Sequence, residues 1–145
     1  MKLHEYITNS LDPAVPYTAY DKVFVVVKPG FLQLTDDILK RFAEDGWVID
    51  KTIVKKLLLK EAHKLYQIHK KKDFYKPLCE YMSSDISRAF ILKRKDQNDD
   101  PFKAVAKIKD EIREKYGESD MRNVLHSSDK MDNMMKEAPI YFGVV

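Results

Sequence analysis

Hydrophobic residues fall along the chain in two patterns, short continuous runs and repeats at helical spacing. The run 23–27 reads Val-Phe-Val-Val-Val, which is typical of a central strand buried on both faces. A second hydrophobic stretch, from Trp47 to about Val54, predicts another strand. Between them, helical spacing predicts a helix with Thr35 as its N-cap and Gly46 as its stop.

The middle of the chain predicts a pair of helices followed by a strand. A basic helical stretch begins at Lys60 and runs to about His69, and the cluster Lys-Lys-Lys at 70–72 separates it from a second helical stretch over 74–82. These two stretches are expected to form a helical hairpin. The run 86–92 then predicts a third strand.

The second half predicts two more helices and a last strand. Asp100 is an expected N-cap with Pro101 at the first helical position. A Met-rich helix is expected to begin at Ser128 or Asp129, and 140–142, Ile-Tyr-Phe, is expected to supply the fourth strand. The hydrophobic residues of the helix after Asp100 share one face: Phe102, Val105 and Ile108.

The order of these elements is βαββαβ, which predicts an α+β, ferredoxin-like fold. Its four-stranded antiparallel sheet would be covered by helices. Residues 1–20 lack periodicity and are interpreted as an N-terminal arm or extension, ahead of one domain over 21–145. Many unrelated functions use this plan, so the fold alone indicates little about function.

Composition excludes several classes of protein. The 145 residues are 44% hydrophobic, which is enough for one core, and 26 basic against 23 acidic residues leave a formal charge of only +3. The lysine clusters alternate with acids, which disfavours nucleic acid as a partner. No apolar run approaches the roughly 20 residues that span a bilayer, so we expect a cytoplasmic protein without a membrane partner. The single Cys79 excludes an internal disulfide and is expected to be a buried, inert thiol.

The polar run 123–129, Asn-Val-Leu-His-Ser-Ser-Asp, carries the strongest chemical signal. Neutral imidazole is a nucleophile near pH 7, and a Glu137 carboxylate held by Ser128 could orient one ring nitrogen of His126 while the other faces a phosphate. The alternative is a capped loop histidine before a helix.

Other polar residues also allow two interpretations. Lys28 ends a buried strand, where packing needs no charge, although a strand-end lysine is usually just solvated. Tyr66 and His69 are three residues apart, so both could donate to one phosphate oxygen; otherwise they are a packing residue and a surface residue. Arg113 could bind phosphate or form a surface ion pair, and Asn123 could cap a turn.

Several motifs follow one another along the chain in a characteristic order. They are Val-Phe-Val-Val-Val-Lys-Pro-Gly at 23–30, Tyr-x-x-His at 66–69 followed by Phe-Tyr at 74–75, Ile-Arg-x-x-Tyr-Gly at 112–117, and Asn-x-x-His-x-Ser-Asp at 123–129. The most specific is the last, which has a glutamate eleven residues after the histidine. In these motifs the chain resembles the nucleoside diphosphate kinase family from about Asp21 to Phe142.

The resemblance implies a function and a set of site residues. It implies a phosphotransferase that moves the terminal phosphate of a nucleoside triphosphate to a nucleoside diphosphate, in a ping-pong reaction through phosphohistidine. It also implies Mg²⁺ held mainly by the nucleotide phosphates, and a homo-oligomer, a hexamer or tetramer built from dimers. The implied catalytic residues are His126, Glu137 and Ser128, and the implied nucleotide-binding residues are Lys28, Tyr66, His69, Phe74, Lys107, Arg113 and Asn123. Among these, Phe74 would stack on the base, Asn123 would bind the sugar hydroxyl and Arg113 would bind phosphate.

The chain also departs from the family pattern. Lys107 stands where the family has an arginine, Ser127 stands where a glycine or alanine follows the histidine, and the loop before the histidine is shortened. The missing part of that loop carries a phosphate-binding threonine and subunit contacts in the family. A second hypothesis therefore stays open: a weak or inactive nucleotide-binding module that acts through its oligomer surface or through 70–72.

Overall fold

The structure is a computed structural model and describes residues 20–95 and 97–143. The arm predicted over 1–20 lies outside these residues except for Tyr20, which is the first residue of a strand.

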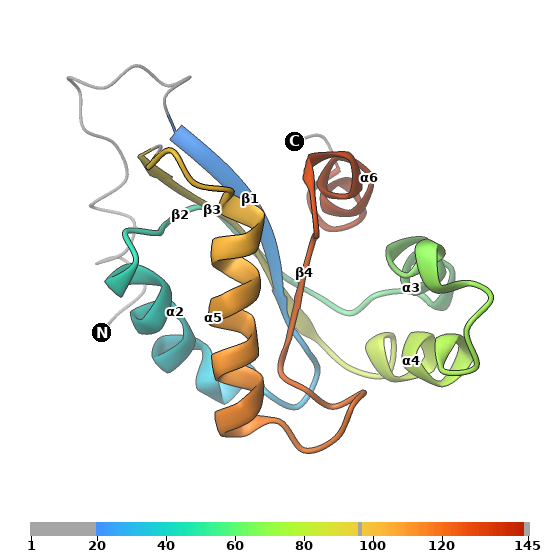
Figure 1. The fold of residues 1–145 in the computed structure, drawn as a ribbon. Coiled ribbons are helices and arrows are strands. Elements are labelled where there is room, and N and C mark those ends of the chain that lie inside the picture. The colour runs from blue at the N-terminus through green and yellow to red at the C-terminus, as the bar shows by residue number, and fades with distance from the viewer. Residues whose placement is uncertain (1–19, 96, 144–145) are drawn as a thin grey trace.

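A single antiparallel sheet forms the centre of the described chain (Figure 1). The strand order is β2-β3-β1-β4, and each neighbouring pair is antiparallel. The α+β fold with a four-stranded antiparallel sheet is therefore confirmed. The strands are β1 (Tyr20–Val27), β2 (Val48–Lys55), β3 (Ser87–Lys95) and β4 (Leu125–Ser127).

The helices cover both faces of this sheet. Helices α2 and α5 lie on one face, α6 lies on the other with α3 beside it, and α4 packs against α3 (Figure 1). The helices are α2 (Thr35–Glu44), α3 (Leu59–Leu65), α4 (Tyr75–Met82), α5 (Pro101–Tyr116) and α6 (Met131–Phe142), with 3₁₀ turns at Leu32–Leu34 and Gln67–His69.

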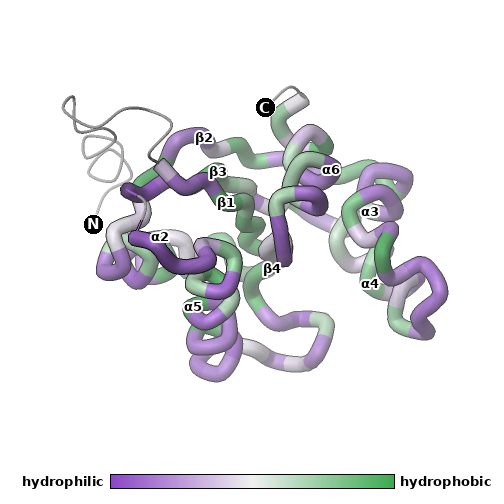
Figure 2. Tube along the Cα trace, turned by 45° about the horizontal axis from the view of Figure 1, so that its top comes forward, coloured by the Kyte–Doolittle hydropathy of each residue, from purple (hydrophilic) through white to green (hydrophobic). Residues whose placement is uncertain are grey.

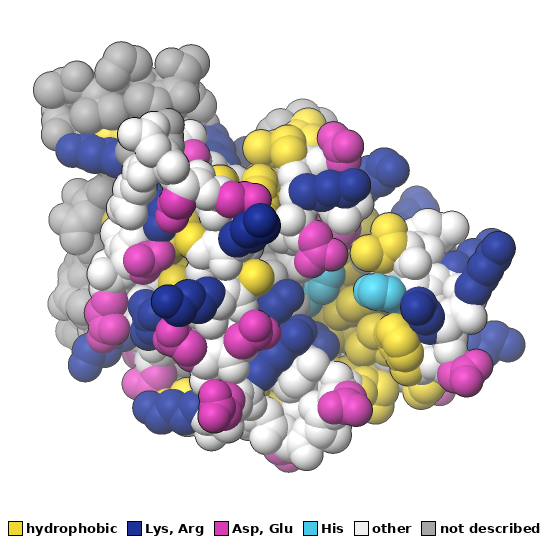
Figure 3. Space-filling view, viewed as in Figure 1, with side chains coloured by type: hydrophobic (Ala, Val, Ile, Leu, Met, Phe, Trp, Pro, Cys, Tyr) yellow, Lys and Arg dark blue, Asp and Glu magenta, His cyan; other side chains and the backbone are white. Residues whose placement is uncertain are grey.

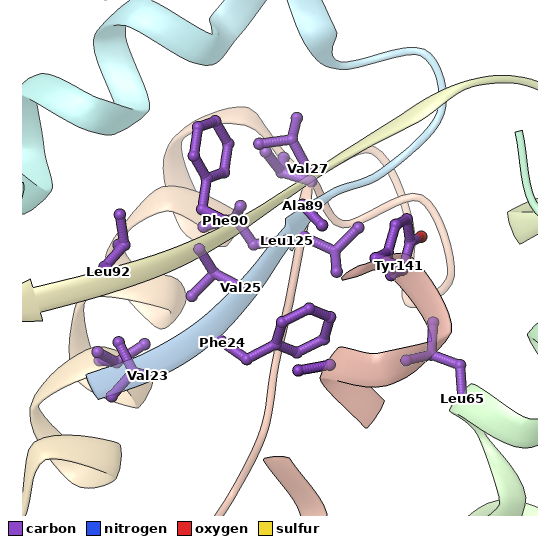
Figure 4. Packing of buried hydrophobic residues seen from close by; sticks show 14 of the residues in the cluster. Val23, Phe24, Val25, Val27, Leu65, Ala89, Phe90, Leu92, Leu125 and Tyr141 are labelled. Atoms are coloured by element: carbon purple, nitrogen blue, oxygen red, sulfur yellow. The ribbon is translucent and has the colours of Figure 1, made fainter. Parts of the chain in front are cut away.

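The core lies on both faces of β1, as its uniformly hydrophobic run predicts. Phe24 points toward α6, where its ring centroid is 5.9 Å from that of Tyr141, whereas Val25 points to the opposite side of the strand (Figure 4). Figure 2 shows β1 as a hydrophobic segment in the middle of the fold, with hydrophilic residues on the turn between α3 and α4. Both neighbours of Phe24 are buried as well.

Helix α5 begins as the sequence predicts. The Asp100 carboxylate accepts hydrogen bonds from the backbone N–H groups of Phe102 and Lys103, at 3.0 and 3.3 Å, and Pro101 takes the first helical position. The helix then runs for 16 residues without interruption. Residues four apart on it share a face, so their side chains project to the same side of the helix.

The prediction of the fourth strand at 140–142 is wrong. These residues are the last of α6, which accommodates Pro139 inside the helix, and the fourth strand is β4, which pairs with residues 25–27 of β1. The three residues of β4 are too few to show a periodic pattern. Ile-Tyr-Phe is hydrophobic because α6 turns Tyr141 into the core.

Two predicted helix starts also need correction. Helix α6 begins at Met131 rather than at Ser128 or Asp129, because Lys130 before it is still extended. The residue before α2 is Leu34, and Thr35 is already helical. The Thr35 hydroxyl donates to the Leu32 carbonyl oxygen at 2.6 Å instead of capping the helix that follows.

Candidate active site

His126 lies on the edge strand β4, at the point where the sheet ends. It pairs with Val26, so the pleat places it on the same face as Phe24, whose ring centroid is 6.2 Å away. A tight turn directly before β4 sets the direction of the strand. In this turn Val124 has φ of +80°, and the Leu125 N–H donates to the Asn123 carbonyl at 3.0 Å. A β-branched residue at positive φ is strained, so the surrounding structure must hold this turn in place.

Glu137, from α6, orients the His126 ring. The Nε2–H of His126 donates to Glu137 Oε1, and the Ser128 hydroxyl donates to the same oxygen at 3.1 Å. A carboxylate only accepts, so Nε2 carries the hydrogen and Nδ1 keeps the lone pair. Burial lowers the pKa of His126 and the Glu137 carboxylate opposes this shift. The ring is thereby favoured as a neutral nucleophile.

Cationic side chains form one wall beside this ring. Lys28 is 3% exposed, and its Nζ donates to Asn123 Oδ1 at 2.7 Å and to the Met121 carbonyl at 3.2 Å. Burial, together with the nearby charges of Arg113 and Lys109, lowers the pKa of Lys28 to about 7. Burial also lowers the pKa of Lys109, and Arg113 adds to that effect. Positive charges gathered in this way favour a bound anion.

Two buried polar atoms in the same place lack a partner. Tyr66 Oη and Arg113 Nε make no hydrogen bond within the described residues, although Arg113 Nη2 donates to the Leu125 carbonyl at 2.7 Å. The Tyr66 ring meets the His126 ring edge to face, with centroids 5.3 Å apart. Unpaired buried donors are costly, and both side chains line the same cleft, so a ligand whose oxygens reached these atoms would remove that cost.

The opposite wall is apolar and comes from the α3–α4 hairpin. Phe74 is 47% exposed and Ile68 is 57% exposed, although both are large hydrophobic residues. His69 lies behind Phe74, with ring centroids 5.4 Å apart. The basic helix that the sequence predicts from Lys60 ends at Leu65, and a 3₁₀ turn places His69 instead.

These groups enclose a cleft of about 520 Å³. Figure 3 shows histidine side chains in a hollow between Lys and Arg side chains on one side and hydrophobic side chains on the other. The predicted site residues that line this cleft are Lys28, Tyr66, His69, Phe74, Arg113, Asn123, His126 and Glu137. Ser128 lies behind it and holds Glu137, and Ser127 is a lining residue beside His126.

Lys107 does not lie with the other predicted residues. It is exposed on α5 and does not line the cleft, whereas Lys109 does. The sequence contained a signal that was missed: Lys109 and Arg113 are four residues apart on one continuous helix, so they share a face.

A second hollow, of about 480 Å³, lies between α2 and α5. Its Arg41 already pairs with Glu111 at 2.7 Å, and no histidine lines it. Within 20–95 and 97–143, no group of three or more His, Cys, Asp or Glu side chains could hold a metal ion. In the same ranges, no helix is long and apolar enough to cross a membrane. The cleft beside β4 is therefore the candidate active site.

An α+β protein with an oriented imidazole beside lysine and arginine side chains has the kind of site that suits a phosphate group. A family model described as nucleoside diphosphate kinase matches residues 21–144, and the chain belongs to this family.

Individual relatives agree with this assignment. The chain is 34% identical over 133 residues to a nucleoside diphosphate kinase of Fervidobacterium nodosum, covering 84% of this chain and 88% of the relative. It is 31% identical to that of Kosmotoga olearia with the same coverage. Among solved structures, the nucleoside diphosphate kinase of Aquifex aeolicus superposes with a TM-score of 0.74 at 25% identity, covering 84% of this chain and 94% of that one.

Proposed function

We propose that this protein transfers the terminal phosphate of a nucleoside triphosphate to a nucleoside diphosphate, with His126 carrying the phosphate between the two nucleotides. One observation carries the proposal: Glu137, which Ser128 holds in place, accepts from Nε2 of His126, while Nδ1 keeps its lone pair beside a cationic wall. The family assignment and the names of the relatives support it.

The reaction has two mirror-image halves. The Nδ1 lone pair of His126 attacks the terminal phosphorus, the bond to the bridging oxygen breaks, and its electron pair leaves with the diphosphate. The Glu137 carboxylate offsets the positive charge that the ring gains. An acceptor diphosphate then attacks the phosphorus, and the bond to Nδ1 breaks, which restores the neutral ring.

The cleft supplies donors for the transferred group. Lys28, Lys109 and Arg113 would neutralise the phosphate oxygens, and Tyr66 Oη and Arg113 Nε would gain the partners they lack. We assign to Lys109 the charge that the resemblance placed on Lys107, because only Lys109 faces the cleft. A lysine there supplies positive charge but cannot make the bidentate hydrogen bonds to phosphate that an arginine makes.

The remaining lining residues suit a nucleoside. Phe74 and Ile68 offer an exposed apolar surface for a base, and a π-face stacks on any base. Asn123 and Lys28, already bonded to each other, would face the sugar. His69 would support the Phe74 ring and reach the phosphates from the same wall.

The residues present fit Mg²⁺ that is bound through the nucleotide. Such an ion would be held mainly by phosphate oxygens, because Mg²⁺ prefers oxygen ligands and keeps several waters. Asp120 and Asp129 both line the cleft, and their carboxylates would accept hydrogen bonds from water molecules on the ion. When bound, the ion would neutralise charge on the leaving phosphates.

The assembly and the location stay predictions. A homo-oligomer built from dimers accords with the apolar side chains exposed on and beside the edge strand β2, and sedimentation would measure its size. We also still expect a cytoplasmic protein. The exposed apolar residues are Ile53, Val54, Leu58, Leu59 and Ile86.

One labelling experiment tests the function. Incubation with γ-labelled ATP and Mg²⁺ should leave acid-labile, alkali-stable label on the protein, and a nucleoside diphosphate should discharge it. His126→Gln should abolish the label. His63→Gln is the matched control, because His63 stacks on Tyr75 outside the cleft and should keep the label. Absence of label in the wild type would leave the inactive binding module as the better description.

A further inference from the structure

Arg122 closes the short loop that precedes His126. Its carbonyl accepts from the Glu118 and Ser119 N–H groups, at 2.8 and 3.3 Å, and its own N–H donates to Ser119 Oγ at 3.0 Å. The loop 117–124 is therefore folded back on itself, with Arg122 at the closing point. The guanidinium takes no part in these three bonds.

The Arg122 guanidinium lies over two aromatic rings from different parts of the fold. Its Cζ is 5.3 Å from the ring centroid of Phe31, in the segment after β1, and 5.3 Å from that of Tyr81, on α4. The Tyr81 hydroxyl in turn donates to the Pro29 carbonyl. One side chain thus joins the loop before β4, the segment after β1 and helix α4.

These three segments carry opposite walls of the cleft. Asn123 and Met121, on either side of Arg122, accept the hydrogen bonds of Lys28. Helix α4 directly follows Phe74, the exposed ring of the apolar wall. A contact from Arg122 to Tyr81 therefore links the polar wall of the cleft to the apolar wall.

Gly30 makes room for this contact. A Cβ atom at that position would lie 2.8 Å from Arg122 Nη2, and the backbone there has φ of +89°. The positive φ favours glycine at this position, and a Cβ atom there would also force the guanidinium to shift.

We propose that Arg122 is a positioning residue for nucleotide binding, which holds the two walls of the cleft at the separation that a nucleoside diphosphate needs. The proposal builds on the proposed function but concerns binding rather than transfer. Glu118 also pairs with Arg122, at 3.2 Å, but 56% of its side-chain surface is exposed, so that pair contributes little.

Calorimetric titration with ADP tests the proposal without any turnover. Arg122→Met should weaken ADP binding about tenfold, since it removes two cation–π contacts at once. Tyr81→Leu should weaken binding by a similar factor, and the double variant should lose little more than either single one, because both remove the same link. Glu118→Gln is the control that leaves the rings covered and should bind ADP as the wild type does.

A second readout separates positioning from general damage. Phosphoramidate is a small phosphoryl donor without base or sugar: His126 attacks its phosphorus and ammonia leaves. Arg122→Met should be phosphorylated by it at a rate close to that of the wild type, because Glu137 and the pairing of β4 with β1 fix His126, and Arg122 contacts neither. Arg122→Lys should recover part of the ADP affinity, since it keeps a cation over the rings.

The outcomes remain distinct from those of the labelling experiment. A wild type that binds ADP but takes no label from ATP would end the proposed function and leave this inference intact. Unchanged ADP affinity in Arg122→Met, additive losses in the double variant, or a parallel fall in phosphoramidate labelling would each overturn it.

Discussion

At the scale of single residues, the site depends on how one imidazole is held. His126 has both a partner that accepts from Nε2 and an environment that disfavours its charged form. Because Ser128 also donates to Glu137 Oε1, the carboxylate is fixed before any ligand arrives. Such an outer partner tunes a reactive side chain without touching the substrate.

Replacing that partner should change both the rate and its pH dependence. Glu137→Gln should lower the rate of phosphotransfer by about 10- to 100-fold. This loss is smaller than that expected for His126→Gln, because Glu137 orients the ring and does not attack the phosphorus. The carboxylate raises the pKa of His126, so its removal lowers that pKa and keeps the ring neutral at lower pH. The acid limb of kcat should therefore move to lower pH. Equal losses of activity in Glu137→Gln and His126→Gln would contradict the assigned roles. A shift of the acid limb of kcat to higher pH would contradict them as well.

Lys28 allows a second test by pH. Its pKa of about 7 means that the free enzyme loses this charge near neutrality, so kcat/KM should fall as the pH rises above 7. Lys109→Met removes a like charge that lowers this pKa, so the alkaline limb should move to higher pH even though the overall rate falls. The substrate's own ionisation is common to both proteins and cancels in the comparison. If the alkaline limb of kcat/KM stayed at the same pH, a group other than Lys28 would be responsible for it.

The sequence indicated most of these residues but not all of their neighbours. Lys28 and Arg113 are recognisable because each belongs to a motif, and the structure brings both to the cleft. Lys109 belongs to no motif, and only the continuity of α5 reveals that it faces the same way as Arg113. The mutual bond of Lys28 and Asn123 joins residues 95 positions apart, and no local pattern predicts such a contact.

At the scale of elements, local signals predicted several helices and strands correctly, but they failed for Ile-Tyr-Phe at 140–142, which is helical, and for Thr35, which is not an N-cap. Asp100 and Pro101 start α5 as expected, and the β-branched run makes β1. The strand that carries His126 has no such signal, because three residues show no period and pairing with β1 alone makes them a strand. The element nearest the chemistry was thus the hardest to predict.

The turn after β1 can be tested by substitution at Gly30. Gly30→Ala should destabilise the protein by more than about 1–2 kcal/mol, since positive φ and the collision with Arg122 add together. Gly46→Ala is the matched control: its φ is +88°, but the nearest atom to its Cβ, Gln97 Nε2, is 3.5 Å away. Urea unfolding measures the difference between the two variants. Equal losses of unfolding free energy in Gly30→Ala and Gly46→Ala would show that contact with the Arg122 guanidinium does not restrict this turn.

At the scale of the whole molecule, the cleft lies where the sheet ends and helices from both faces meet. Helix α5 contributes Lys109 and Arg113 from one face, and α6 contributes Glu137 from the other. The α3–α4 hairpin forms the outer wall (Figure 1). Charges gathered at such a junction oppose folding until an anion neutralises them. Ligand binding and stability should therefore be linked.

Thermal unfolding with different ligands measures this link. ADP at about 100 times its Kd should stabilise the protein by about 2.7 kcal/mol, and inorganic pyrophosphate should give a large part of the same shift in Tm. Adenosine, which has no phosphate, should shift Tm only slightly. The cations and the unpaired atoms of Tyr66 and Arg113 would bind phosphate oxygens rather than a base. Arg113→Met should reduce the shift with pyrophosphate and leave any shift with adenosine unchanged. If adenosine stabilised as well as ADP, the base would dominate binding, and the cationic wall would have to serve some purpose other than phosphate recognition.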